Sequence, residues 1–282
     1  MIVFRNAFRA LLPGLLLLAA HTLRAQSPGA PEPLAIGQTF TLPSKVLGET
    51  RRINVYLPPG YADSAALHLP VLYMPDGGVQ EDFLHVAGLV QVLVGNGAMR
   101  PFILVGIENT ARRRDLTGPT ANPEDRKIAP RVGGSAAFRQ FIRTELMPAI
   151  QQRYRTTAET AVVGESLAGL FVVETLLLEP DLFNTYLAFD PSLWWNNEQL
   201  ARQAGALLRA HPGPPKTLYL ATSNEPQIVA DTQRLAKTLA GPDGRGVAWH
   251  YDPMPQETHG TIYHPAALKG FRLVFKPPAA AH

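Results

Sequence analysis

The sequence of 282 residues contains no cysteine. This absence excludes disulfide bonds, cysteine-ligated metal sites, thiol catalysis and a lipid-modified cysteine behind a leader peptide. A protein without disulfides must rely on buried apolar side chains, and a hydrophobic content of 46% provides them. The length suits one domain with a sizeable core better than two domains.

Long hydrophobic runs are also missing. The most apolar stretch, residues 11–20, has ten residues and contains a proline, whereas a membrane-spanning helix needs about 20 residues. Arg5 and Arg9 precede this stretch, and Leu23-Arg24-Ala25 follows it, which is the pattern of a secretory signal peptide cleaved after Ala25. We therefore expect residues 1–25 to be a signal peptide, and the mature protein to be periplasmic or secreted without membrane insertion.

The predicted mature chain lacks a net charge of either sign. The whole sequence has 26 basic and 23 acidic residues, but Arg5, Arg9 and Arg24 lie in the leader, which has no acidic residue. The remaining chain is balanced at 23 residues of each sign. It therefore has no global basic field that would indicate binding to nucleic acid or to a membrane surface.

Short apolar runs alternate with helical patterns along the chain. Continuous apolar runs at residues 69–74 and 102–107 are typical of strands buried on both faces. We expect further strands at residues 52–57, 161–163, 186–189, 217–221 and 247–251, and helices at 81–95, 138–154, 231–239, 265–275 and directly after residue 166. This alternation predicts a single α/β domain with a doubly wound, mostly parallel sheet and no large lid. The expected divisions are a flexible segment at 26–37, the domain at 38–276 and a frayed tail at 277–282.

The segment Gly164-Glu165-Ser166-Leu167-Ala168-Gly169 has the pattern of a nucleophile elbow. An apolar run enters it and a helical pattern leaves it, as expected for a strand, a tight turn with serine at its apex, and a helix. The small residues Gly164, Ala168 and Gly169 allow the two backbones to pass closely, with Ala168 where the pattern usually has glycine. Ser166 is therefore the predicted nucleophile, at the positive end of the following helix.

A serine hydroxyl needs a base to remove its proton. In this fold the base is a histidine after the last strand, and His259 follows the strand expected at 247–251. The orienting acid should follow the strand expected at 217–221, where Glu225 is the first choice and Asp231 the second. Glu225 also fits a loop carboxylate that caps the following helix, and a serine–histidine dyad without an acid is a third alternative.

An oxyanion hole needs two N–H groups directed at one point. The first is expected from Leu167, the residue after the nucleophile. The second is expected from the loop Met74-Pro75-Asp76-Gly77-Gly78, where the Gly78 N–H is the first choice because glycine lets the backbone approach a substrate. An ordinary glycine turn is the alternative interpretation of this loop.

Four further blocks accompany the elbow, at residues 72–77, 105–117, 190–195 and 257–261. With the elbow, they resemble the bacterial putative-esterase family of α/β-hydrolases, the group that includes the siderophore (enterobactin-type) esterases. The resemblance covers residues 38–276. The block at 105–117 resembles the family's V-G-I-x-N-x-x-R-x-x-D-x-T pattern. The block at 190–195 resembles S-P-S-L-W-W, with Asp190 in place of the serine.

The resemblance implies that Ser166 is the nucleophile and His259 the base, with a dyad known in some members. It also implies that Arg112 lies beside the active site and contacts an anionic or phenolate-bearing substrate. The alternative for Arg112 is a solvated charge run in which Asp115 pairs with one arginine. Of the adjacent indoles Trp194 and Trp195, we expect one to face the cleft, because side chains of neighbouring strand residues point to opposite sides.

These observations predict an exported serine carboxylic-ester hydrolase that works through an acyl-enzyme, on siderophore-like or other bulky polar esters. No metal or organic cofactor is implied, and the expected partner is a small-molecule ester. One alternative is an acyltransferase on the same scaffold. A serine peptidase is less favoured because no lid or propeller is indicated. A non-catalytic module that binds a siderophore or glycan is disfavoured by the intact serine, histidine and glycines.

Overall fold

The computed structural model describes residues 33–211 and 214–278. From Ala35 onward, the described residues belong to one compact unit. The predicted signal peptide, residues 26–32 of the predicted flexible segment, and residues 279–282 of the predicted tail lie outside the described residues. Among the helices that are described, none has the length and apolar character that crossing a bilayer requires.

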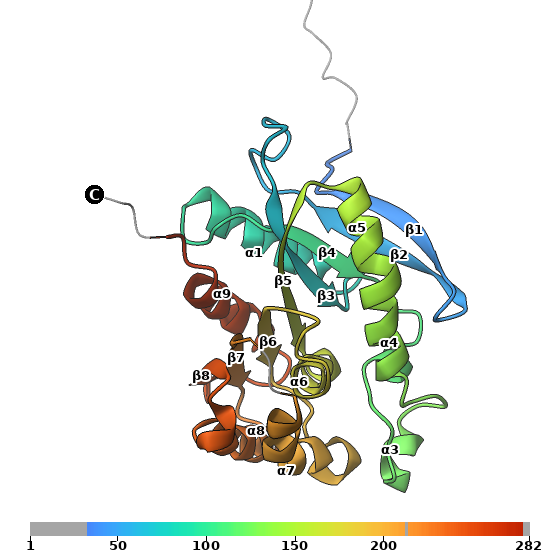
Figure 1. Cartoon of the computed structure of the whole chain (residues 1–282), viewed down its shortest axis with the longest axis vertical. Coiled ribbons are helices and arrows are strands. Elements are labelled where there is room, and N and C mark those ends of the chain that lie inside the picture. Colours follow the sequence, from blue (N-terminus) through green and yellow to red (C-terminus); the bar gives the residue numbers. More distant parts are fainter. Residues whose placement is uncertain (1–32, 212–213, 279–282) are drawn as a thin grey trace, which may run out of the picture. The chain divides into compact units, whose positions relative to one another are not determined.

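Eight strands form one sheet in the order β1-β2-β4-β3-β5-β6-β7-β8 (Figure 1). The strands β1 and β2 pair antiparallel, as do β2 and β4, and all the other neighbours are parallel. Their bounds are β1 Gln38–Ser44, β2 Glu49–Tyr56, β3 Leu69–Pro75, β4 Ile103–Ile107, β5 Thr156–Glu165, β6 Thr185–Phe189, β7 Lys216–Thr222 and β8 Val247–Pro253. This arrangement confirms the predicted doubly wound, mostly parallel sheet.

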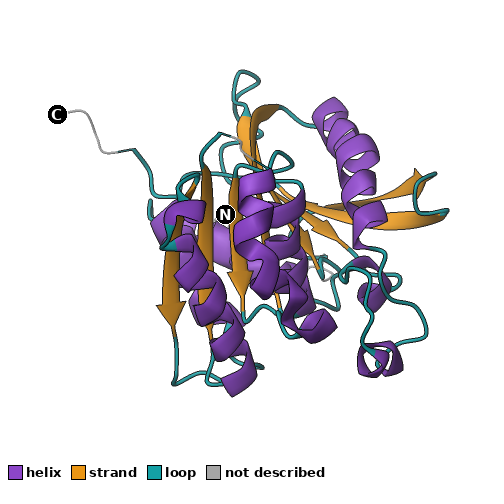
Figure 2. Cartoon of the chain, turned by 60° about the horizontal axis from the view of Figure 1, so that its bottom comes forward, coloured by secondary structure: helices purple, strands orange, loops and turns teal. Residues whose placement is uncertain are grey.

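Helices cover both faces of the sheet (Figure 2). Alternate residues of β3 enter two separate apolar layers, since Val71 and Tyr73 pack with α4, α5 and α6, whereas Leu72 and Met74 pack with α1 and α9. The helices are α1 Phe83–Gly95, α2 Arg112–Asp115, α3 Pro123–Lys127, α4 Ser135–Phe141, α5 Met147–Arg153, α6 Leu167–Leu178, α7 Trp195–Ala210, α8 Pro226–Leu239 and α9 Tyr263–Val274. The sheet is therefore buried on both sides, as its continuous apolar strands require.

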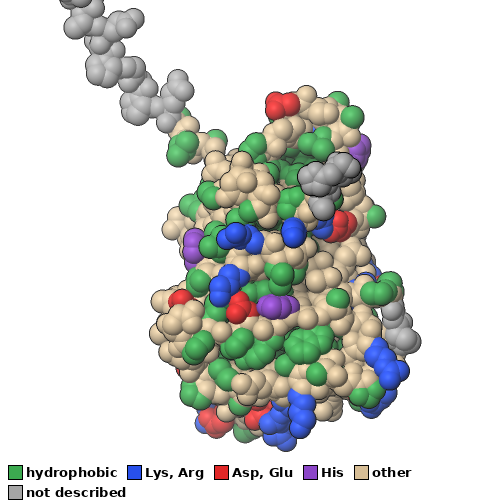
Figure 3. Space-filling view, turned by 90° about the vertical axis from the view of Figure 1, so that its left-hand side faces the viewer, with side chains coloured by type: hydrophobic (Ala, Val, Ile, Leu, Met, Phe, Trp, Pro, Cys, Tyr) green, Lys and Arg blue, Asp and Glu red, His purple; other side chains and the backbone are tan. Residues whose placement is uncertain are grey.

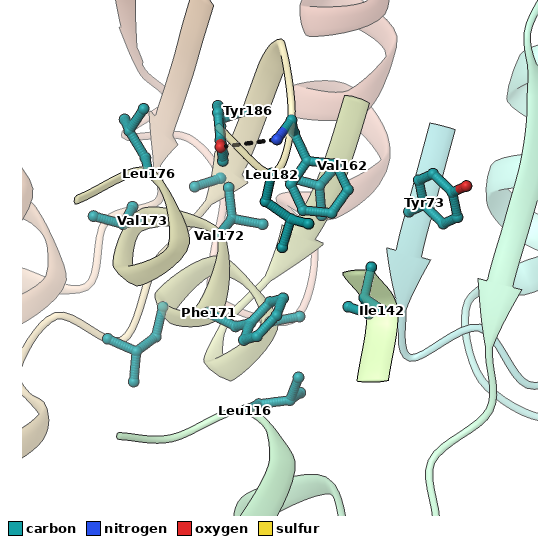
Figure 4. Packing of buried hydrophobic residues seen from close by; sticks show 14 of the residues in the cluster. Tyr73, Leu116, Ile142, Val162, Phe171, Val172, Val173, Leu176, Leu182 and Tyr186 are labelled. Atoms are coloured by element: carbon teal, nitrogen blue, oxygen red, sulfur yellow. Dashed lines mark hydrogen bonds between the residues drawn. The ribbon is translucent and has the colours of Figure 1, made fainter. Parts of the chain in front are cut away.

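Helix α6, which follows the predicted nucleophile, is at the centre of one layer. Nearly all its residues are buried, as expected for a helix that is apolar on every side. Figure 4 shows Phe171, Val172 and Leu176 of this helix beside Val162 of β5 and Tyr186 of β6. Burial on this scale fixes the start of α6 relative to the ends of the central strands.

Two helical predictions needed correction. The helix expected at 138–154 is divided by a π-helical turn, Ile142–Leu146, between α4 and α5. Pro148 explains the division, because it has no N–H for the carbonyl four residues earlier. Helix α8 begins at Pro226 rather than near residue 231, with proline in the first turn where its missing N–H costs nothing. Helix α7 was not predicted.

A buried ion pair ties helix α2 to the sheet. The Arg51 side chain of β2 is 0% exposed and the Asp115 side chain of α2 is 1% exposed, and Arg51 Nη2 donates to Asp115. Arg114 Nε donates to the other Asp115 oxygen at 2.6 Å, and Arg114 also pairs with Glu49. By contrast, the surface in Figure 3 intersperses basic, acidic and apolar side chains. The buried pair attaches the end of α2 to β2.

Replacing Arg51 with methionine is expected to lower the free energy of unfolding by about 3–5 kcal/mol, because Asp115 then keeps a buried charge without its fully buried partner. Urea unfolding measures this change. The matched control is Lys127→Met, since the Lys127–Glu124 pair is 70% exposed on both sides and such pairs contribute about 0–1 kcal/mol. Equal losses for both variants would contradict a structural role for the buried pair.

Candidate active site

Ser166 lies at the sharp turn between β5 and α6, with φ +60° and ψ −121°. This conformation is strained for a residue with a side chain. A Cβ on Gly164 would lie 2.6 Å from the Cβ and carbonyl carbon of Ala168, so only glycine allows the strand and helix to pass this closely. The Ser166 N–H donates to the Phe189 carbonyl at the end of β6, at 3.0 Å. The local geometry is that of the predicted elbow.

His259 lies in the loop after β8, and the structure brings it to Ser166 as predicted. Its Nε2 is 3.0 Å from Ser166 Oγ, and its Nδ1 is 2.8 Å from Asp190 Oδ2. The imidazole is 42% exposed, whereas the Asp190 side chain is fully buried. Serine, histidine and aspartate therefore form one chain of hydrogen bonds from the surface into the interior.

The carboxylate at the imidazole is Asp190, which corrects the prediction of Glu225 or Asp231. Asp190 follows β6 directly, with φ +44°. It accepts hydrogen bonds from the Ser223 N–H and the Ser223 Oγ, both at 2.6 Å, in addition to the one from His259. Two donors from the end of β7 thus hold its two oxygens in place.

Neither predicted acid reaches His259. Glu225 is at the N-cap position of α8 and lines the cavity beside Ser166, but its side chain makes no capping hydrogen bond and none to the imidazole. Asp231 is buried in α8 and accepts a hydrogen bond from Gln227 Nε2 at 3.0 Å. The dyad alternative is also corrected, because the imidazole does have a carboxylate partner.

The electrostatics of the site favour a charged imidazole. The hydrogen bond to Asp190 raises the pKa of His259 above its usual value, against the lowering effect of burial, and the nearby Glu165 carboxyl adds to the rise. Glu165 is the residue before the nucleophile, and its Oε1 lies 3.4 Å from His259 Nδ1. Burial raises the pKa of Glu165 to about 8.

A cavity of about 520 Å³ opens at Ser166. Its lining combines cationic, acidic, amide and apolar groups, from residues Arg112, Arg113, Ile128, Ser166, Leu167, Ser192, Trp194, Glu225, Gln227, Ile228 and His259. A larger hollow of about 670 Å³ lies along α9 and contains none of the hydrogen-bonded serine, histidine and aspartate. We therefore place the candidate site in the smaller cavity.

The predicted Arg112 lines this cavity, held by a bidentate ion pair. Its Nε and Nη2 donate to the two oxygens of Asp76 at 2.7 and 2.8 Å, and Asn109 Nδ2 donates to the same carboxylate. Asp76 ends the β3 segment with φ +56°. Because Arg113 donates to the Ile128 carbonyl and Arg114 to acidic side chains, the arginine run is not simply a solvated charge run.

The two indoles have different environments. Trp194 lines the cavity, whereas Trp195 is buried and its Nε1 donates to the Gly118 carbonyl at 2.9 Å. They lie at the start of α7 and not on a strand, so the prediction that one indole faces the cleft holds for a different reason. Three residues with positive φ follow them, Asn196, Asn197 and Glu198.

Of the two predicted oxyanion donors, only Leu167 lies at the cavity. Leu167 is the first residue of α6 and lines the cavity, so its N–H lacks an intrahelical acceptor. The Gly78 N–H instead donates to Glu81 Oε2 at 2.7 Å, and Gly78 does not line the cavity. The prediction for Gly78 is therefore corrected. The glycine that this loop needs is Gly77, because a Cβ there would lie 2.3 Å from the Gly106 backbone.

One potential metal-ligand atom from each of Glu165, Asp190 and His259 lies within 4.8 Å of the other two, close enough for all three to bind one metal ion. In this structure Asp190 and Ser166 occupy the two ring nitrogens of His259 through hydrogen bonds. We therefore interpret the cluster as part of the serine–histidine–aspartate chain.

Comparison with protein families matches residues 44–245 to the family described as "Putative esterase". The chain belongs to this family. Among solved structures, it is 31% identical to an IroE-like serine hydrolase from Shewanella oneidensis, with a TM-score of 0.76 over 85% of this chain and 80% of that one. The siderophore hydrolase EstB from Aspergillus nidulans shares the fold at 21% identity, with a TM-score of 0.72 over 88% and 97% of the two chains.

Curated relatives are similar over shorter stretches. The chain is 31% identical to the ferri-bacillibactin esterase BesA of Bacillus subtilis over 56% of its own length and 61% of the relative's. It is 32% identical to the siderophore triacetylfusarinine C esterase of Aspergillus fumigatus, over 63% of each chain. The chain thus spans about three fifths of the length of these relatives. The predicted resemblance and the α/β-hydrolase fold are confirmed.

Replacing Gly164 with alanine is expected to push β5 and α6 apart, because the added Cβ has no room at Ala168. We expect a loss of about 1–3 kcal/mol in the free energy of unfolding and displacement of Ser166 from His259. Urea unfolding and a crystal structure of the variant would show both. The control is Gly88→Ala in α1, where a Cβ meets nothing within 4 Å; a Gly164 variant as stable as this control would refute the close-packing argument.

Proposed function

We propose that this protein is a serine carboxylic-ester hydrolase that forms an acyl-enzyme on Ser166. The observation that carries the proposal is the chain of hydrogen bonds from Ser166 Oγ to His259 Nε2, at 3.0 Å, and from His259 Nδ1 to Asp190, at 2.8 Å. The chain begins on a strained elbow that opens into a cavity. Family membership and the named esterases among its relatives support this reaction class.

In this mechanism, His259 Nε2 accepts the Ser166 proton as Oγ attacks the ester carbonyl. Asp190 stabilises the imidazolium that forms and keeps the second proton on Nδ1. The Leu167 N–H, at the positive end of α6, donates to the oxyanion. The imidazolium then protonates the leaving alcohol, which leaves an acyl group on Ser166. Water, deprotonated by the same histidine, attacks the acyl carbonyl, and the imidazolium returns the proton to Ser166 Oγ as the bond to the acid breaks.

The cavity supports a bulky polar ester as substrate. Trp194 offers an apolar wall, and Arg112 adds a cation whose Nη1 is not used by Asp76. An arginine held in this way can contact an anionic or phenolate oxygen without moving. Relatives named for the hydrolysis of bacillibactin and triacetylfusarinine C support a siderophore-like ester.

The proposal includes export. The basic start, apolar stretch and Leu23-Arg24-Ala25 of the leader support a signal peptide that directs the enzyme to the periplasm or beyond. There the enzyme would meet esters that enter from outside the cell.

Ser166→Ala is expected to lower kcat/KM for p-nitrophenyl esters of two to twelve carbons by about 10⁴-fold or more, because the attacking oxygen is gone. Initial rates measure this loss, and the chain-length profile measures the acyl pocket. Ser64→Ala, at an exposed serine outside the cavity, is the matched control. Equal rates for the wild type and Ser166→Ala at every length would contradict a general esterase and leave only an enzyme restricted to siderophore-like esters, an acyltransferase or a binding module.

Asp190→Asn is expected to lower both the rate and the pH at which activity is lost. Only the neutral imidazole accepts the serine proton, so kcat/KM falls as the pH drops through the pKa of His259. Since Asp190 raises that pKa, its removal moves the acid limb of the kcat/KM profile to lower pH. The wrong imidazole tautomer also reduces the plateau, by up to about 10⁴-fold. Glu225→Gln is the comparison, and a larger loss from it than from Asp190→Asn would identify Glu225 as the acid.

A further inference from the structure

A second carboxyl group lies at the Nδ1 edge of His259. Glu165 Oε1 is 3.4 Å from Nδ1, compared with 2.8 Å for Asp190 Oδ2. His259 Nδ1 makes a hydrogen bond to Asp190 and none to Glu165. Glu165 Oε1 is buried without a hydrogen-bond partner among the described residues, on a side chain that is only 16% exposed. The proposed mechanism leaves this group unused.

The two carboxyl groups differ in the number of hydrogen bonds they accept from the protein. Asp190 receives three hydrogen bonds, from the Ser223 N–H, Ser223 Oγ and His259. Glu165 Oε1 receives none, and burial raises the pKa of Glu165 to about 8. Desolvation therefore keeps Glu165 mostly protonated at neutral pH, beside a carboxylate whose two oxygens are both hydrogen-bonded.

The charged and titratable groups around Glu165 come from five parts of the fold. Asp190 and Asp76 raise the pKa of Glu165, whereas His259 and Arg112 lower it, and the buried Tyr263 of α9 also senses the Glu165 charge. Loss of the Asp190 charge therefore removes one influence that keeps Glu165 protonated. Glu165 then ionises at lower pH, beside the nitrogen that has lost its acceptor.

We propose that Glu165 is a second positioning carboxyl for His259, which accepts the Nδ1–H when Asp190 does not. The proposal rests on the proposed function and deepens it. A small shift of the side chain brings Oε1 from 3.4 Å to hydrogen-bond distance. Glu165 acts only through His259, by holding the ring with Nε2 toward Ser166, and it does not touch substrate.

The test compares wild type, Glu165→Gln, Asp190→Ala and the double variant, with kcat/KM for p-nitrophenyl butyrate from pH 5 to 10. Asp190→Ala is used because an asparagine at this position can fix the wrong tautomer. We expect Glu165→Gln alone to lower kcat/KM less than about tenfold and Asp190→Ala to lower it about 10–100-fold. The second loss is well short of the roughly 10⁴-fold loss when the only acid of a triad is replaced by alanine. Adding Glu165→Gln to Asp190→Ala should lower kcat/KM by a further tenfold or more. Because this loss exceeds that of Glu165→Gln alone, the two effects are not additive, which shows that both carboxyl groups act through His259.

The matched control adds Glu124→Gln, at a 70% exposed carboxyl, to Asp190→Ala. This control should leave kcat/KM unchanged, and unfolding midpoints verify that all variants are folded. The proposal is overturned if Glu165→Gln changes kcat/KM by the same factor in the wild-type and Asp190→Ala backgrounds.

A second readout does not require ester hydrolysis. NMR titration of the His259 ring should show a lower pKa in the double variant than in Asp190→Ala, because Glu165 ionises at lower pH once Asp190 is replaced and its charge then raises the His259 pKa. An equal pKa of His259 in Asp190→Ala and in the double variant would refute the proposal even in an inactive protein. Failure of the esterase function would instead appear as no difference between wild type and Ser166→Ala, with the titration shifts intact.

Discussion

The close passage of β5 and α6 at Gly164 and Ala168 is the constraint on which the site depends. It forces the intervening serine into a backbone conformation that costs about 1–3 kcal/mol. Nearly every residue of α6 is buried against the sheet, and this burial offsets the strain. The Ser166 N–H donates to Phe189, so the elbow is also attached to the end of β6. The next residue, Asp190, is the carboxylate of the hydrogen-bonded chain.

Backbone strain occurs at three neighbouring strand ends. Asp76, Ser166 and Asp190 follow or end β3, β5 and β6, and all three have positive φ without being glycine. Each of the three side chains makes a polar contact of the candidate site, at the same edge of the sheet. Asp76 holds Arg112, Ser166 supplies the hydroxyl, and Asp190 orients His259. The carboxyl edge of a parallel sheet is where α/β proteins place their ligands, and the helices packed on both faces (Figure 2) keep these strand ends in register.

The sequence was sufficient to predict the sheet, the elbow and the histidine, because each depends on a local pattern. Apolar runs identify the buried strands, small residues identify the turn at Ser166, and chain order identifies His259. The acid was wrongly predicted because the choice depends on which strand end faces the imidazole, which is a tertiary property. A signal was present, since an aspartate at position 190 stands where the similar family has serine. The prediction of Gly78 as an oxyanion donor was wrong for a related reason. Its N–H donates to the side chain of Glu81, a contact that the local glycine pattern does not predict.

Covalent labelling tests the central claim, a Ser166 hydroxyl activated through His259, most directly. The full-length protein is treated with a fluorophosphonate and the adduct is located by mass spectrometry, with His259→Ala as the comparison. The account predicts one adduct, on Ser166, which forms faster as the pH rises through the pKa of His259 and is nearly lost in His259→Ala. An adduct on another residue, or labelling of Ser166 at the same rate without His259, would contradict it.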